Sequence, residues 1–172
     1  MAPTLKAFLA DPGKALAKGP VALIFAEDES EIDSTLRHHL DLGFRSVLFL
    51  APDDFDIARD VAADPRLARI RHDLAAGETV TGAVNAVIDR APGLWLFYCY
   101  NAEYLFYPFC ETRTVGELLA FHAEERRDAT PARVATDRSA ESSGLTSRSD
   151  ARRLCPAPFR EHDPAELLER LL

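Results

Sequence analysis

Hydrophobic and polar residues follow one another in the first 127 residues in a pattern that predicts alternating strands and helices. Continuous apolar runs such as VALIFA are typical of strands that are buried on both faces. The predicted strands are 21–26, 44–50, a weaker one at 67–70, and strands within 94–109. Apolar residues at helical spacing predict helices at 30–42, about 54–63, 78–90 and 114–127.

Boundary residues support several of these helices. Ser30 is a plausible N-cap for the first of them, and Gly43 suits the left-handed position that ends it. Thr114 and Glu117 have the spacing of a capping box, which predicts the start of the last helix. Residues 1–19 contain apolar side chains at helical spacing and predict a short amphipathic lead-in.

Strands and helices in alternation predict an α/β fold: a three-layer α/β/α arrangement around a mostly parallel, Rossmann-like sheet. We expect this domain to span residues 20–127. From Asp128 to Arg153 the chain contains almost no large apolar side chains, which is typical of a disordered segment. Residues 154–172 are expected to end in a short amphipathic helix. One hypothesis for this abrupt change is a frameshift or a truncated reading frame, which comparison of the alternative frames of the gene would test.

The run LWLFYCYNAEYLFYPF at 94–109 is apolar except at Asn101 and Glu103. It predicts a buried hairpin of two strands joined by a tight turn. A carboxylate between buried strands is costly unless it has a partner or a function, so Glu103 is the first candidate residue.

Polar residues follow several predicted strands at their carboxyl ends, where ligands bind in parallel α/β sheets. Glu27, Asp28 and Glu29 follow the first strand, Asp53 and Asp54 follow the second, and Asn101 and Glu103 lie in the turn of the aromatic run. We expect these residues to converge on one edge of the sheet. Each group also has a structural interpretation. Glu103 is equally explained by a salt bridge to Arg113 or by backbone N–H groups, Glu27 to Glu29 by a solvated helix N-terminus, and Asp53 or Asp54 by a turn and a helix cap.

The composition of the chain argues against several classes of partner and compartment. The net charge of −8 argues against nucleic acid as a partner, because phosphate binding requires clustered Lys and Arg. Three cysteines without CxxC spacing argue against a disulfide framework and favour a reducing compartment. No apolar run is long enough to span a bilayer and no targeting signal is evident, so we expect a cytoplasmic protein.

Several motifs together give the chain a family resemblance over about residues 20–127. They are the acidic turn after the first strand, HLDLGF at 39–44, LWLFYCYNAEYLFYP at 94–108 and TVGELLAF at 114–121. In their order and spacing they resemble the glycosyltransferase family 2-like proteins of GT-A fold, and specifically their nucleotide-sugar-binding half. In the Asp-x-Asp metal loop of that family, Tyr100 and Ala102 stand here where the two aspartates belong, and Glu103 is retained.

The resemblance implies transfer of a sugar from a nucleotide-diphosphate donor to an acceptor whose identity is open. Glu27, Asp28, Glu29, Asp53 and Asp54 would line the nucleotide-sugar pocket. Glu103, with Asn101, would hold a divalent cation, Mn²⁺ or Mg²⁺, on the diphosphate. The alternative is a truncated or degenerate, non-catalytic member of the fold that acts as a binding module. An incomplete domain would also expose apolar surface that invites self-association.

Overall fold

The computed structural model describes residues 1–124, 130–136 and 151–156. In these ranges the helices are α1 (Leu5–Ala10), α2 (Ile32–Asp41), α3 (Arg59–Ala62), α4 (Val80–Arg90) and α5 (Val115–Glu124). The strands are β1 (Val21–Phe25), β2 (Ser46–Ala51), β3 (Leu67–Arg71), β4 (Trp95–Tyr100), β5 (Glu103–Phe106), β6 (Thr130–Thr136) and β7 (Ala151–Pro156). Of these helices, none is both long and apolar enough to cross a membrane.

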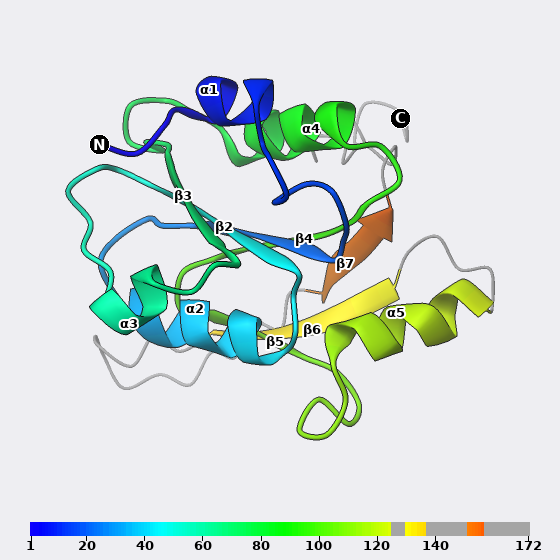
Figure 1. Cartoon of the computed structure of the whole chain (residues 1–172). Coiled ribbons are helices and arrows are strands. Elements are labelled where there is room, and N and C mark those ends of the chain that lie inside the picture. The colour runs from blue at the N-terminus through cyan, green and yellow to red at the C-terminus, as the bar shows by residue number, and fades with distance from the viewer. Residues whose placement is uncertain (125–129, 137–150, 157–172) are drawn as a thin grey trace, which may run out of the picture.

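The sheet confirms the α/β prediction. Its strand order is β3-β2-β1-β4-β7-β6-β5, and the first four strands are parallel. Helices α1 and α4 lie on one face of this parallel half, and α2, α3 and α5 lie on the other (Figure 1). The described part of the chain therefore forms three layers around a mostly parallel sheet, followed by an antiparallel portion.

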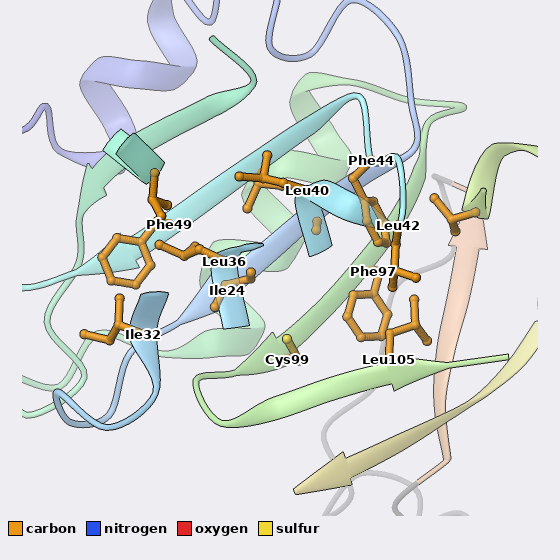
Figure 2. Close-up of a cluster of buried hydrophobic side chains, with 14 of the residues drawn as sticks. Ile24, Ile32, Leu36, Leu40, Leu42, Phe44, Phe49, Phe97, Cys99 and Leu105 are labelled. Carbon is orange, nitrogen blue, oxygen red and sulfur yellow. The ribbon is translucent and has the colours of Figure 1, made fainter. Parts of the chain in front are cut away.

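Strand β1 lies at the centre of the parallel half and is buried along its whole length. Successive side chains point to opposite faces of a strand. Accordingly Leu23 and Phe25 pack beneath α1 and α4, whereas Ala22 and Ile24 pack against α2. Helix α2 contributes Leu36 and other apolar residues to the hydrophobic cluster on its own face of the sheet. Figure 2 shows side chains from α2, the sheet and Leu105 of β5 meeting in this cluster. This packing explains the continuous apolar run in the sequence.

The two ends of α2 differ in how well the sequence predicts them. Gly43 has φ 85° just past the C-terminus, as expected. The N-cap is Glu31, not Ser30, and Glu31 makes no side-chain cap. The prediction is wrong because Ser30 belongs to the preceding loop: its N–H donates to Asp28 Oδ1 at 2.8 Å. The capping box of α5 is confirmed, since the Thr114 N–H donates to Glu117 Oε2 at 2.8 Å and the Glu117 N–H donates to Thr114 Oγ1 at 3.3 Å.

Helix α3 is shorter than predicted, and neither Asp53 nor Asp54 caps it. The helix begins after Ala58, whose N–H donates to Asp33 Oδ1 of α2 at 2.8 Å. The preceding residues remain a loop because the Arg69 guanidinium binds their backbone: Nη2 donates to the carbonyl oxygens of Asp53 at 2.8 Å and Phe55 at 2.5 Å. These contacts tie the loop to β3 before α3 begins.

The aromatic run forms two strands and a tight turn, as predicted, but the strands are not a hairpin. Strand β5 pairs with β6, and β4 pairs with β1 and, over its first residues, with β7.

The expected disorder at 128–153 is also wrong for β6 and for the part of β7 in that range, since their backbones pair in the sheet. Backbone pairing satisfies main-chain polar groups without large apolar side chains. The remaining residues of that segment, and the helix predicted near the C-terminus, lie outside the described residues.

Candidate functional site

The order of the parallel strands reverses between β1 and β4, where β1 leads through α2 to β2 on one side and β4 lies on the other. In open α/β sheets, this switch point at the carboxyl ends of the strands is the usual ligand site. Residues Glu27 to Glu31 follow β1 here, and Asn101 and Ala102 follow β4. The structure thus brings together two of the polar segments that the sequence predicts to converge.

Asn101 ties these two segments together through its side-chain amide. Its Oδ1 accepts a hydrogen bond from the Glu27 N–H at 2.9 Å. Its Nδ2 donates to Asp28 Oδ1 at 2.7 Å and to the Ser30 carbonyl oxygen at 2.8 Å. Asn101 is buried, so these bonds replace water around the amide. The side chain predicted as a weak metal ligand holds the β1–α2 loop in place.

Thr35 makes a second link across the switch point. Its hydroxyl donates to the Glu31 carbonyl oxygen at 2.6 Å and accepts from the Ala102 N–H at 2.9 Å. Glu31 and Ala102 have φ values of 50° and 58°, a region that residues with a Cβ rarely adopt. Thr35 is fully buried. One hydroxyl therefore holds two left-handed residues from separate loops, a role that the sequence pattern did not reveal.

Glu103 lies at the start of β5 and is 9% exposed. Its Oε2 accepts a hydrogen bond from the Tyr100 N–H at 2.7 Å. The carboxylate thus provides a hydrogen-bond acceptor for the backbone N–H group of Tyr100 at the end of β4, where the chain turns away into β5. Of the two structural explanations of Glu103, the one through a backbone N–H group is confirmed.

The acidic residues after β1 lie on the surface of the same loop. Glu27, Asp28 and Glu29 are all exposed, and Asp28 Oδ1 accepts from the Ser30 N–H and from Asn101 Nδ2. Over residues 1–124, 130–136 and 151–156, no group of three His, Cys, Asp or Glu side chains is placed to hold a metal ion. The switch point is thus a hydrogen-bonded junction with an acidic rim.

Asp53, past the end of β2, lies in a different setting. It lines an open cavity of about 360 Å³ together with Arg69 and the N-terminal residues Met1, Ala2 and Pro3. Asp53 Oδ1 accepts a hydrogen bond from the Ala2 N–H at 3.1 Å. Asp54 is exposed and is not among the lining residues.

Arg69 is a site residue that the sequence interpretation missed. Its Nη2 is used by loop carbonyl groups, but its Nε is buried and has no hydrogen-bond partner among the described residues. Arg69 thus lines the cavity and holds the loop beside it, while its Nε lies out of reach of solvent. The signal in the sequence was a basic residue inside the predicted strand 67–70.

The histidines of α2 have packing roles. His38 Nε2 donates to the Leu105 carbonyl oxygen at 2.8 Å, which attaches α2 to β5. His39 Nδ1 donates to the Thr35 carbonyl oxygen at 2.8 Å, and its ring stacks on Phe97. Complete burial lowers the pKa of His39 to about 3, so its ring is neutral at physiological pH.

No protein-family model matches this chain, and no curated protein sequence matches it. The structure establishes an α/β fold with a mostly parallel sheet. The closer likeness to GT-A glycosyltransferases stays a prediction from the motifs named above.

Proposed function

We propose that this domain binds the nucleotide part of a nucleotide-diphosphate sugar at the carboxyl edge of its parallel sheet, as the resemblance to family 2-like glycosyltransferases implies. The observation that carries the proposal is the cavity between Asp53 and Arg69, past the strand end where the sequence predicts nucleotide contacts. Further support comes from the strand order β3-β2-β1-β4, which is that of doubly wound nucleotide-binding sheets.

The lining of the cavity suits a nucleoside. A carboxylate accepts hydrogen bonds from ribose hydroxyl groups, and a guanidinium donates to acceptors of a base or stacks on its ring. Met1 and Pro3 add apolar surface. A mostly apolar concavity with a few placed polar groups is the usual form of a small-molecule site.

Transfer of the sugar would require groups that stabilise charge on the leaving diphosphate, for which the family resemblance implies a divalent cation. The two predicted ligands do not fit that role as they are arranged. Asn101 Oδ1 accepts from the Glu27 N–H, and Glu103 Oε2 accepts from the Tyr100 N–H. We therefore derive no transfer step through a cation.

The use of Asn101 and Glu103 by backbone N–H groups favours a second candidate function. In this alternative the chain is a non-catalytic member of the fold that binds the nucleotide without turnover. The amide and the carboxylate that would serve the cation serve the backbone of the junction. The two candidates make the same prediction for the Asp53 cavity and different predictions for Glu103.

Titration calorimetry with UDP- and GDP-sugars, with and without Mn²⁺, tests both candidates. Asp53→Asn keeps the acceptor for the Ala2 N–H but removes the charge, and we expect it to weaken binding about tenfold, equivalent to roughly 1.4 kcal/mol. Asp54→Asn is the matched control and should bind like the wild type. Absence of binding heat with every nucleotide-sugar would contradict both candidate functions.

Glu103→Gln separates the candidates, because glutamine retains an oxygen acceptor for the Tyr100 N–H but is a poor cation ligand. Loss of Mn²⁺-dependent affinity in this variant would support the transferase. Unchanged affinity would show that Glu103 does not act through a metal, and would support the binding module.

A further inference from the structure

His72 is a buried imidazole that neither candidate function uses. It follows β3 directly, is 3% exposed, and its backbone N–H donates to the Ala51 carbonyl oxygen at 3.0 Å. Its ring packs edge-on against Phe25 of β1, with the ring centroids 5.5 Å apart. Both ring nitrogens are buried, and neither has a hydrogen-bond partner among the described residues. Leaving such a group unpaired is unfavourable for folding.

The loop that follows His72, Asp73 to Thr79, connects β3 to α4 and is held by short-range hydrogen bonds. Asp73 Oδ1 accepts from the N–H groups of Ala75 at 2.9 Å and Ala76 at 3.1 Å. The Asp73 N–H donates to Glu78 Oε2 at 2.5 Å. Leu74 packs this loop against the core cluster on the α1/α4 face. Because the hydrogen bonds join residues within the loop, its opening breaks no backbone pairing of the sheet.

Two carboxylates act on the ring. Glu78 Oε2 lies 3.5 Å from His72 Nδ1, and Asp73 is adjacent in the chain. The neighbouring strands present the Phe25 ring and the Ala51 carbonyl group. Burial lowers the pKa of His72 more than Glu78 and Asp73 raise it, so the net pKa is below the ordinary value. The closed arrangement therefore favours a neutral ring.

We infer that residues 73–79 form an acid-operated latch, which stays closed over a neutral His72 and opens when the imidazole takes up a proton from solvent. Protonation places an N–H on both ring nitrogens. Glu78 is close enough to attract one of them, but the closed segment gives Nε2 no acceptor. Opening of the segment lets water solvate the imidazolium. The inference is independent of the proposed nucleotide site.

Amide hydrogen exchange measured by NMR at pH 7.5 and pH 5.0, corrected for intrinsic exchange rates, tests the latch. The informative amides are those of Asp73, Ala75 and Ala76, and those of β1 report on global unfolding. At pH 5.0 we expect protection of the loop amides to fall several-fold, and to stay below that of β1 at both pH values. Loop protection that does not change with pH, or that equals that of β1 throughout, would overturn the inference.

Two variants sharpen the test. His72→Phe keeps an aromatic ring against Phe25 and cannot be protonated, so the acid response of the loop should disappear. Glu78→Gln keeps an acceptor for the Asp73 N–H and removes the attractive charge, so the acid response should become larger. An undiminished response in His72→Phe would refute the latch. If that variant fails to fold, titration of the wild-type imidazole nitrogens decides: their midpoint must match that of the loop amides, and different midpoints would refute it.

Discussion

The carboxyl edge of the sheet contains two neighbouring regions that use polar residues in opposite ways. At the switch point, Asn101 and Thr35 direct their polar atoms at backbone groups of adjacent loops, and Glu103 accepts from the Tyr100 N–H at the end of β4. In the cavity past β2 and β3, Asp53 and Arg69 line an open space, where Asp53 Oδ1 accepts from the Ala2 N–H and Arg69 Nη2 donates to loop carbonyl groups. Position at a strand end therefore does not by itself make a polar residue a ligand. What matters is whether the fold already uses its hydrogen-bonding capacity.

The largest effect should come from Asn101→Ala. It removes the acceptor for the Glu27 N–H and the donor for Asp28 and Ser30. We expect a loss of about 2–3 kcal/mol in the free energy of unfolding, since three part-buried hydrogen bonds are lost at about 0.5–1.5 kcal/mol each. Urea unfolding followed by circular dichroism measures the loss.

Asn85→Ala is the control for that substitution, because Asn85 Oδ1 is buried on α4 and has no partner among the described residues. It should cost little or be neutral, since alanine favours the helix. Equal losses in the two variants would contradict the structural role of Asn101.

Substitutions of Thr35 test the same junction, and we expect a smaller loss of stability from them. Thr35→Val keeps the shape but removes the hydroxyl that joins Glu31 and Ala102, and we expect a loss of about 1–3 kcal/mol in stability. Thr35→Ser keeps the hydroxyl and removes only a methyl group, for which about 0.8 kcal/mol is expected. If the serine variant were the less stable of the two in thermal or urea unfolding, the hydroxyl bridge would not be what matters at this position.

The pH dependence of stability should be smaller again. His39 has a folded-state pKa of about 3 against an ordinary value of 6.5. Its contribution is complete above pH 6.5 and is lost as the pH falls from 6.5 toward 3, because the unfolded state binds the proton more readily. Between pH 7.5 and 5.5 the loss from this group is roughly 1 kcal/mol.

Denaturant unfolding at those two pH values measures the loss for His39. The pKa of His72 is also lowered and acts in the same direction, so the wild type should lose more than a His72→Phe variant. Stability that rises on acidification to pH 5.5 would contradict the burial of neutral histidines in this core.

Local patterns in the sequence predicted the parts of the fold that depend on local interactions. The central strands, the Gly43 end of α2 and the capping box at Thr114 follow from apolar runs and short-range hydrogen bonds. The departure of β5 from β4 could not be predicted in this way, because its partner is β6, a segment poor in apolar residues. Pairing of that kind depends on backbone groups distant in sequence.

The candidate site also could be predicted only in part from local patterns in the sequence. Its location at the carboxyl edge was predictable from the alternation of strands and helices. Which residues remain available to a ligand was not, because Asn101 binds the backbone of the β1–α2 loop and Glu103 accepts from the Tyr100 N–H at the end of β4. Arg69 escaped notice for a related reason: its contacts to the β2–α3 loop and its unpaired Nε exist only once β3 lies beside β2.

Chemical-shift mapping by ¹H–¹⁵N NMR, with UDP and GDP in the presence of Mg²⁺, distinguishes the Asp53 cavity from the switch point as the ligand site. If the nucleotide binds in the cavity, the largest chemical-shift changes will be at Ala2, Asp53 and Arg69, and the Asn101 side-chain amide signals will stay in place. Shifts concentrated at Glu27 to Ser30 and at Asn101, with none around Asp53 and Arg69, would contradict the assignment of these two regions.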